Sequence, residues 1–222
     1  MRVPILVYHS ILPRHQGETE QQKRFSVTPE HFAAELRYLK DHGYTAVSLD
    51  ALADYFSVGR TLPAHPVILT FDDGWENQYA NGFPILKEYG FTATFFIFSN
   101  APDYGRFMSW AQISKLQDAG MTIGGHSKSH PYLYKITDPA ELRKEIIESK
   151  KIIEEHIGRP VTVFAYPFGR YSTESLAIVK EAGYRTARTM YGGVSHTAAD
   201  LFTLKIVEAG DDVPMFERNL NR

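Results

Sequence analysis

The sequence predicts an α/β fold in one domain, a (β/α)7-type barrel of parallel strands. Apolar runs of strand length, such as Pro66–Phe71 (PVILTF) and Thr92–Phe98 (TATFFIF), are typical of strands that are buried on both faces. Helical patterns follow these runs, and roughly seven strand–helix units favour a closed barrel over an open sheet. The 222 residues suit a single domain, and no repeat, low-complexity tract or Pro/Gly linker divides them.

The first elements of the chain are predicted from hydrophobic pattern and capping residues. Val3–Tyr8 (VPILVY) is expected to be a buried strand, and the polar segment Ile11–Lys23 a surface loop. A helix then begins at Thr28–Glu30 (TPE), because Thr is a good N-cap, Pro suits the first helical position and Glu favours the positive helix end. Gly43 ends this helix.

The same criteria predict the rest of the chain. Further strands are expected at Ala46–Leu49, Pro66–Phe71, Thr92–Phe98, Met121–Gly124, Val161–Tyr166, Arg185–Thr189 and Phe202–Val207. Further helices are expected at Leu49–Phe56, Tyr79–Tyr89, Trp110–Ala119, Pro139–Ile157 and Ser172–Ala182.

Composition excludes several classes of function. The formal net charge of −2 provides no basic field for nucleic acid or anionic lipid, and it would not repel a neutral or weakly cationic substrate. The chain has no cysteine, which excludes disulfides, thiolate metal sites and cysteine nucleophiles. Val3–Tyr8 is too short to cross a membrane and lacks the layout of a secretory leader.

The first polar cluster is Thr70–Gly74 (TFDDG), at the end of an expected strand. Successive strand residues point to opposite faces, so Asp72 and Asp73 can share one site only where the strand is ending. Gly74 permits that break in conformation. A solvated Asp-Gly turn is the alternative interpretation.

The second cluster is His126–Pro131 (HSKSHP), after the expected strand Met121–Gly124. Pro131 disfavours helical geometry at His130, so we expect a turn here. Two histidines four residues apart can bind one metal ion. With a carboxylate from the Asp pair, His126 and His130 would form a metal site that leaves positions open for water and substrate. An unliganded histidine pair is the alternative.

A third cluster, Phe164–Gly169 (FAYPFG), also ends an expected strand, although a simple Pro/Gly turn would account for it alone. The order TFDDG, HSxxH and YPFG resembles the polysaccharide deacetylase family, the chitin deacetylase-like carbohydrate esterases. The resemblance covers about Val3 to Val207, nearly the whole chain. It implies a distorted (β/α) barrel and a metal-dependent hydrolase that removes N-acetyl groups from N-acetylglucosamine units of a polysaccharide.

The resemblance also implies roles for individual residues. Asp73, His126 and His130 would bind one divalent metal ion, which is zinc or alternatively cobalt, nickel or manganese. Asp72 would be the general base.

The third cluster is implied to shape the groove. Tyr166 and Pro167 would form part of its wall, and the backbone N–H of Phe168 would help to hold the oxyanion. Four aromatic residues are candidates for stacking on sugar rings: Tyr8, Trp110, Tyr132 and Phe168. Core packing is the alternative for Trp110, which begins an amphipathic helix.

Two departures from the family pattern affect the site. Many members carry an Arg that pairs with the base, where this chain has Ala165. Another cation is therefore expected to orient Asp72, with Lys205 as the first candidate and Arg170 as the second.

The second departure concerns the general acid. The late Leu-x-His motif that supplies it in many relatives is missing here, and His196 lies in a polar segment. His9, however, ends the strand Leu6-Val7-Tyr8-His9, and the first and last strands of a closed barrel are neighbours. This N-terminal pattern is similar to the poly-N-acetylglucosamine deacetylases of biofilm systems, in which the motif order is permuted. His9 is therefore the expected acid.

The expected partner is a polysaccharide or amino-sugar oligomer, with poly-N-acetylglucosamine first. A deacetylase of peptidoglycan or chitin oligomers, a small-molecule amidase, and a carbohydrate-binding relative without turnover are alternatives. Retention of both carboxylates and both histidines of the two motifs favours an enzyme over a binding module. An extracytoplasmic location (secreted, periplasmic or cell-surface) is expected, with an export signal that is not contained in these residues.

Overall fold

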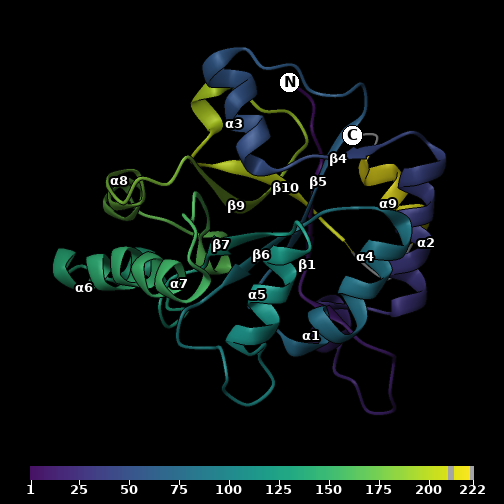
Figure 1. The fold of residues 1–222 in the computed structure, drawn as a ribbon, viewed down its shortest axis with the longest axis horizontal. Coiled ribbons are helices and arrows are strands. Elements are labelled where there is room, and N and C mark those ends of the chain that lie inside the picture. Colours follow the sequence, from purple (N-terminus) through teal and green to yellow (C-terminus); the bar gives the residue numbers. More distant parts are fainter. Residues whose placement is uncertain (210–212, 221–222) are drawn as a thin grey trace.

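Seven parallel strands form a closed barrel in the computed structural model, which describes residues 1–209 and 213–220. The predicted fold class is thus confirmed (Figure 1). The barrel strands are β1 (Ile5–Tyr8), β5 (Pro66–Phe71), β6 (Thr94–Ile97), β7 (Thr122–Gly125), β8 (Val163–Ala165), β9 (Thr186–Gly192) and β10 (Leu204–Glu208). The barrel closes because β1 pairs with β10 on one side and with β5 on the other.

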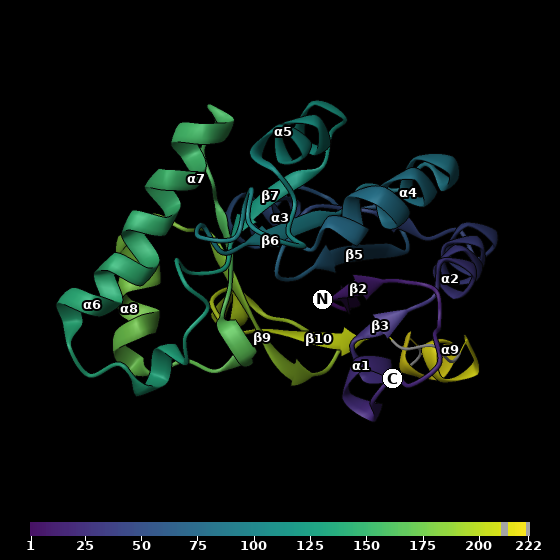
Figure 2. The ribbon, with the colours of Figure 1, turned by 90° about the horizontal axis from the view of Figure 1, so that it is seen from below.

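Helices surround the strands, as Figure 2 shows for α2, α4, α5, α7 and α8. The helices are α1 (Glu20–Arg24), α2 (Pro29–Asp41), α3 (Leu49–Val58), α4 (Phe83–Tyr89), α5 (Trp110–Asp118), α6 (Pro139–Arg143), α7 (Ser149–Ile157), α8 (Thr173–Glu181) and α9 (Val213–Leu220). Two π-helical turns, η1 (Gln78–Gly82) and η3 (Lys144–Glu148), run directly into α4 and α7. Short 3-10 turns are η2 (Leu133–Lys135), η4 (Pro167–Gly169) and η5 (Ala198–Asp200). Within the described ranges, no helix is both long and apolar enough to span a membrane.

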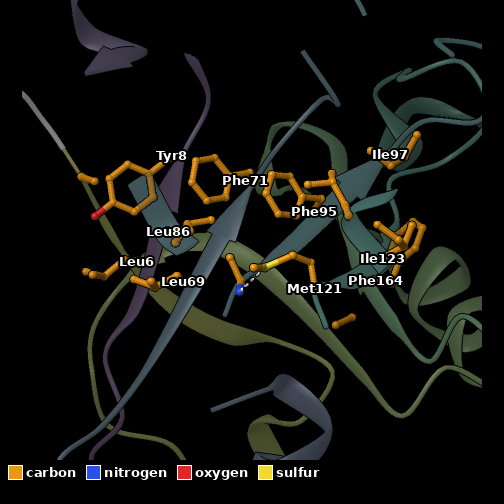
Figure 3. Packing of buried hydrophobic residues seen from close by; sticks show 14 of the residues in the cluster. Leu6, Tyr8, Leu69, Phe71, Leu86, Phe95, Ile97, Met121, Ile123 and Phe164 are labelled. Carbon is orange, nitrogen blue, oxygen red and sulfur yellow. Dashed lines mark hydrogen bonds between the residues drawn. The ribbon is translucent and has the colours of Figure 1, made fainter. Parts of the chain in front are cut away.

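The core has two layers, one on each face of the barrel strands. Leu6 and Tyr8 of β1 pack on the helix side, together with residues such as Phe71 and Phe95 (Figure 3). Ile5 and Val7 belong to the cluster inside the barrel. This alternation follows from the period of two in a strand, and it decides which side chains can reach a site inside the barrel.

Helix α3 closes the end of the barrel at which the strands begin. Leu49 and Leu52 of α3 pack with the inner cluster. Asp50 accepts hydrogen bonds from Thr162 and Arg185, which lie just before β8 and β9. The opposite end, at the carboxyl ends of the strands, remains available for a site.

The expected loop Ile11–Lys23 is the clearest error in the prediction of elements. It contains the start of α1, where Thr19 and Gln22 form a capping box. Before it, β2 (Ser10–Ile11) pairs with β3 (Ser26–Val27), while β4 (Thr45–Ala46) pairs with the start of β5. The helix was missed because α1 has only five residues and buries none, so it leaves no hydrophobic period in the sequence.

Candidate active site

The carboxyl ends of four strands converge on one cavity of about 650 Å³. His9 follows β1, Asp72 and Asp73 follow β5, and His126 follows β7. Phe168 lies three residues beyond the end of β8. The structure brings all of these residues, with His130, to the lining of the cavity. Parallel strands present their carboxyl ends on one side, which explains the convergence of distant motifs.

Asp73, His126 and His130 form a compact group of possible metal ligands. Their ligand atoms all lie within 4.8 Å of one another. Oδ1 of Asp73 is 3.6 Å from Nε2 of His126 and 3.3 Å from Nε2 of His130, and the two Nε2 atoms are 3.2 Å apart. One carboxylate and two imidazoles converging on one point are the donor set of an open divalent metal site.

The hydrogen bond of His126 fixes which ring nitrogen is free to bind a metal. Nδ1 lies 2.6 Å from the carbonyl oxygen of Ala165. Because a carbonyl only accepts, Nδ1 carries the proton and Nε2 keeps its lone pair toward Asp73 and His130. Both the tautomer of His126 and the distances between the ligand atoms therefore suit the binding of a cation.

The loop between the two histidines is anchored by helices outside the barrel. Glu145, a buried residue of η3, accepts hydrogen bonds from the backbone N–H groups of Lys128 and Ser129 and from the Ser129 hydroxyl. The hydroxyl of Ser149 donates to the carbonyl of Ser127. The expectation of a turn rather than a helix at this motif is confirmed, since His130 has a φ of 59°.

Left-handed backbone is concentrated around this cavity. Among the described residues, five that are not glycine have positive φ, and four of them belong to the site motifs: Asp73, Ser127, His130 and Phe168. Non-glycine residues rarely adopt this conformation, and it costs about 1–3 kcal/mol where it occurs. Such concentration of strain is typical of a functional site.

Asp73 is held in its ionised form. The indole Nε1 of Trp75 donates to its Oδ2 at 3.0 Å. Burial alone would raise the pKa of Asp73, but the His126 ring, with His9 and His130 beyond it, lowers this pKa well below its usual range. Asp73 is therefore a carboxylate at neutral pH, as a metal ligand requires.

Asp72 is paired with Arg188, a residue that the sequence analysis did not select. The Arg188 guanidinium donates to Oδ1 of Asp72, and both side chains are buried. The guanidinium also lies 4.9 Å from the centroid of the Phe96 ring. Burial lowers the pKa of Arg188 to about 9, which still leaves it charged at neutral pH.

The two predicted partners of Asp72 were wrong. Lys205 lies between Leu204 and Ile206, which face the inside of the barrel, so strand alternation turns Lys205 outward. Arg170 is exposed, with its guanidinium 5.9 Å from the Tyr134 ring centroid. Neither residue can reach the buried face of Asp72.

Arg188 stands beside the position where the family pattern has its cation. In the parallel pairing of β8 and β9, Ala165 is in register with Arg188. The small side chain of Ala165 leaves room for the neighbouring guanidinium inside the barrel. One signal in the sequence could have identified Arg188: it is a charged residue within an expected barrel strand. A buried sheet tolerates such a charge only if it is paired.

His9 faces the other oxygen of Asp72. Its Nε2 lies 3.8 Å from Oδ2, and its ring packs edge-on against Phe25. Burial lowers the pKa of His9 to about 4; the charge of Asp73 opposes this shift, and Arg188 adds to it. His196 does not line this cavity, because its Nε2 bonds the carbonyl of Val3, two residues before β1.

The aromatic residues divide between cavity and core. Phe168 is 45% exposed, lines the cavity and stacks on Tyr132 with ring centroids 4.0 Å apart. Pro167, the residue before Phe168, is buried within η4.

Three aromatic candidates do not face the cavity. The Tyr8 ring is buried on the helix side of β1 and donates to Glu35 at 2.8 Å. The Tyr166 ring is buried in the same layer. Trp110 packs partly against the core and stacks on His156 at 4.0 Å. The expectations of sugar stacking by Tyr8 and of a groove-wall role for Tyr166 were wrong, because strand alternation directs both rings into the protein. For Trp110, the alternative of core packing is confirmed.

A family model of polysaccharide deacetylases matches residues 59–187, which is more than half of the chain. The chain belongs to the polysaccharide deacetylase family. The match includes the Asp pair, the HSxxH loop and the YPFG turn, whereas His9 and Arg188 lie outside it.

Individual relatives agree with this assignment. A candidate polysaccharide deacetylase of Bacillus subtilis, YxkH, is 27% identical over 91% of this chain and 70% of its own length. The poly-β-1,6-N-acetyl-D-glucosamine N-deacetylase of Staphylococcus aureus is also 27% identical, over 76% of this chain and 62% of its own length. The solved structure of the Streptococcus pyogenes deacetylase PplD has the same fold, with a TM-score of 0.91, 24% identity, and coverage of 99% of this chain and 98% of that one.

Proposed function

We propose that this deacetylase-family chain is a metal-dependent hydrolase that removes N-acetyl groups from N-acetylglucosamine units of a polysaccharide. One observation carries the proposal. The ligand group Asp73, His126 and His130 adjoins a second carboxylate, Asp72, which lies between a fixed cation and an imidazole in an open cavity. A binding module would need neither the second carboxylate nor the imidazole.

Asp73, His126 and His130 would hold one divalent cation, zinc in our proposal. Two imidazoles and one carboxylate suit zinc, and cobalt, nickel and manganese accept the same donors. When bound, the cation supplies Lewis-acid chemistry for the acetyl carbonyl and lowers the pKa of a water molecule. The donors are already converged, the hydrogen bond of His126 to Ala165 directs Nε2 toward the other two ligands, and Asp73 is ionised.

Asp72 would act as the general base. Arg188 occupies its Oδ1, so Oδ2 is the oxygen that faces His9. A carboxylate held in this way keeps one oxygen oriented for the proton of the attacking water. The water oxygen then forms a bond to the acetyl carbon, and its proton passes to Asp72.

His9 would deliver a proton to the departing amine. With a pKa of about 4, His9 is neutral at rest at neutral pH. We infer that the proton taken up by Asp72 moves on to Nε2 of His9, 3.8 Å away, and from there to the amine nitrogen as the carbon–nitrogen bond breaks. The products are the free amine and acetic acid, which becomes acetate by releasing its remaining proton to solvent, and both side chains return to their starting states.

The wall of the cavity would bind the sugar and the oxyanion. The backbone N–H of Phe168 is the proposed oxyanion donor, in a turn with a left-handed residue at this position. The exposed stack of Phe168 and Tyr132 would contact a sugar ring.

Poly-N-acetylglucosamine is the substrate that we propose first, because the Staphylococcus aureus relative is named for deacetylation of this polymer. The alignment spans less than two thirds of that relative, so the assignment of polymer is ours. Peptidoglycan and chitin oligomers are the alternatives. An extracytoplasmic location would give the enzyme access to any of these polymers.

Metal analysis combined with acetate release tests the proposal. The protein should contain one divalent cation per chain, and it should release acetate from poly-N-acetylglucosamine faster than from chitin oligomers or peptidoglycan. Removal of the cation by a chelator should abolish release, and zinc should restore it. Acetate release from none of the polymers by the metal-loaded protein would support a binding function instead.

A further inference from the structure

Gln78 joins the backbone at the two strand ends that carry the proposed acid and base. Its side chain is fully buried in η1, and its amide nitrogen Nε2 donates to the carbonyl of His9 and to the carbonyl of Asp72. Both partners are acceptors, so the amide nitrogen rather than the oxygen must face them. One NH₂ group thus uses its two protons on two residues that are 63 positions apart in the chain.

This bridge begins where strand pairing ends. The register of β1 with β5 runs up to Tyr8 and Phe71, and the N–H of Asp72 donates to the carbonyl of Tyr8. His9 and Asp72 are the next residues on each strand, and their carbonyls are joined only through Gln78 among the hydrogen bonds of the described residues. The Gln78 side chain therefore replaces the next backbone hydrogen bond between the two strands.

The turn that carries Gln78 also binds the segment that follows His9. Asn77 accepts from the N–H of Ile11 and Asn81 donates to its carbonyl, each at 2.8 Å. At Gly82 an added Cβ would lie 3.3 Å from the side chain of Ile11 in β2 and 3.5 Å from that of Phe71 in β5, so the backbone of η1 approaches these two strands closely. A π-helical turn is rare and is often found at functional sites, and here it holds the side chain that spans both strand ends.

We propose that Gln78 is a positioning residue, which fixes the spacing between Asp72 and His9. The inference rests on the proposed function of these two residues. Proton transfer from Oδ2 of Asp72 to Nε2 of His9 depends on their relative position. Beyond the ladder bond from the Asp72 N–H to the Tyr8 carbonyl, the hydrogen bonds of the described residues join the two residues' carbonyls only through Gln78. Without the amide, two carbonyl oxygens would face each other, and the strand ends would move apart.

The test compares Gln78→Met and Gln78→Glu with the control Asn81→Ala. Gln78→Met removes both donors at similar size, and Gln78→Glu replaces the donor nitrogen with a second oxygen. Asn81→Ala removes one bond to the same segment, at Ile11, and touches neither His9 nor Asp72. For each variant, kcat and KM are measured on an acetamide substrate and on an activated aryl acetate, together with metal content.

Both Gln78 variants should lose roughly 10–100-fold in kcat on the amide, the scale expected for a misplaced catalytic group. KM and metal content should be nearly unchanged, and the loss on the aryl acetate should be much smaller, because its leaving group needs little protonation. The control should lose no more than a few-fold on either substrate. In a His9→Ala background, Gln78→Met should have little additional effect on the amide.

Equal losses on amide and ester, or a full additional loss in the His9→Ala background, would overturn the positioning role. If Gln78→Met does not fold, the same amide-to-ester ratio in Gln78→Glu decides the question. Failure of the proposed function would look different, since the wild-type protein would then release no acetate from either class of substrate.

Discussion

Arg188 of β9 forms a buried ion pair with Asp72, which follows β5 and lines the cavity. Arg188 is in register with Ala165 on β8. The cation that orients the base can therefore be supplied from two adjacent strands of the same barrel. The residues at positions 165 and 188 could therefore be exchanged, with arginine on β8 and alanine on β9.

Arg188→Ala should destabilise the protein by about 3–5 kcal/mol, because it leaves the Asp72 carboxylate buried and unpaired. It should also lower turnover sharply. The double variant A165R/R188A should recover part of both, since a guanidinium from position 165 can enter the same space. The bond from His126 to position 165 uses the backbone carbonyl and survives the exchange. Denaturant unfolding and acetate release measure the two effects; a double variant no better than Arg188→Ala would refute the exchange.

His126→Ala should sharply lower metal content and activity, since His126 contributes one of the three converged donors. His156→Ala is a matched control, because His156 stacks on Trp110 outside the cavity. Elemental analysis of the purified variants gives the number of metal ions per chain. Full occupancy in His126→Ala would remove this residue from the ligand set.

Asp72→Asn should keep the metal and lose turnover by about 10²–10⁴-fold, the usual contribution of a general base. The change preserves the shape of the side chain and removes its charge. Metal content and kcat are measured on the same preparation. An empty metal site in this variant would mean that the roles assigned to Asp72 and Asp73 are exchanged.

His9→Ala should leave metal binding intact and depress the rate on acetamide substrates. The loss should be much smaller on an activated aryl acetate, whose leaving group departs without protonation. Steady-state kinetics on the two substrates provide the comparison. An equal loss on both would indicate a packing role for His9, and unchanged amide turnover would exclude His9 as the acid.

The metal-free protein should lose stability as the pH falls from about 6.5 to 4. Burial lowers the folded-state pKa of His9 to about 4, so between these values the unfolded chain binds the proton more tightly. The contribution of His9 is fully present above pH 6.5 and amounts to about 3 kcal/mol for this shift. Denaturant unfolding across this range should show a smaller pH dependence for His9→Gln than for His15→Gln, the control on the exposed part of the neighbouring loop. Identical slopes for the two variants would argue against the buried, neutral state of His9.

The sequence by itself determined the barrel and most of the site. Near-continuous apolar runs predict parallel strands, and polar residues directly after those runs must gather at one end of a parallel barrel. Asp72, Asp73, His126 and His130 were found in this way, Phe168 was named through the family resemblance, and all five line one cavity. His9 was also predicted, because closure of a barrel makes its first strand a neighbour of its last strand. These inferences depend on residue type and on local chain geometry, which a sequence contains, and for Phe168 and His9 also on the resemblance to the family.

Only the tertiary structure decided which cation meets the base and which rings face the cavity. The side chains of a strand alternate between its two faces, but the pattern alone does not say which face is inside. The register of β8 with β9 places Arg188 beside Ala165, and the same alternation turns Lys205 and Tyr8 away from the cavity. The neutral state of His9 depends on burial, to which the ring of Phe25, the residue that caps α1, contributes. Pairing register and burial are relations between distant segments, so they exist only once the barrel has closed.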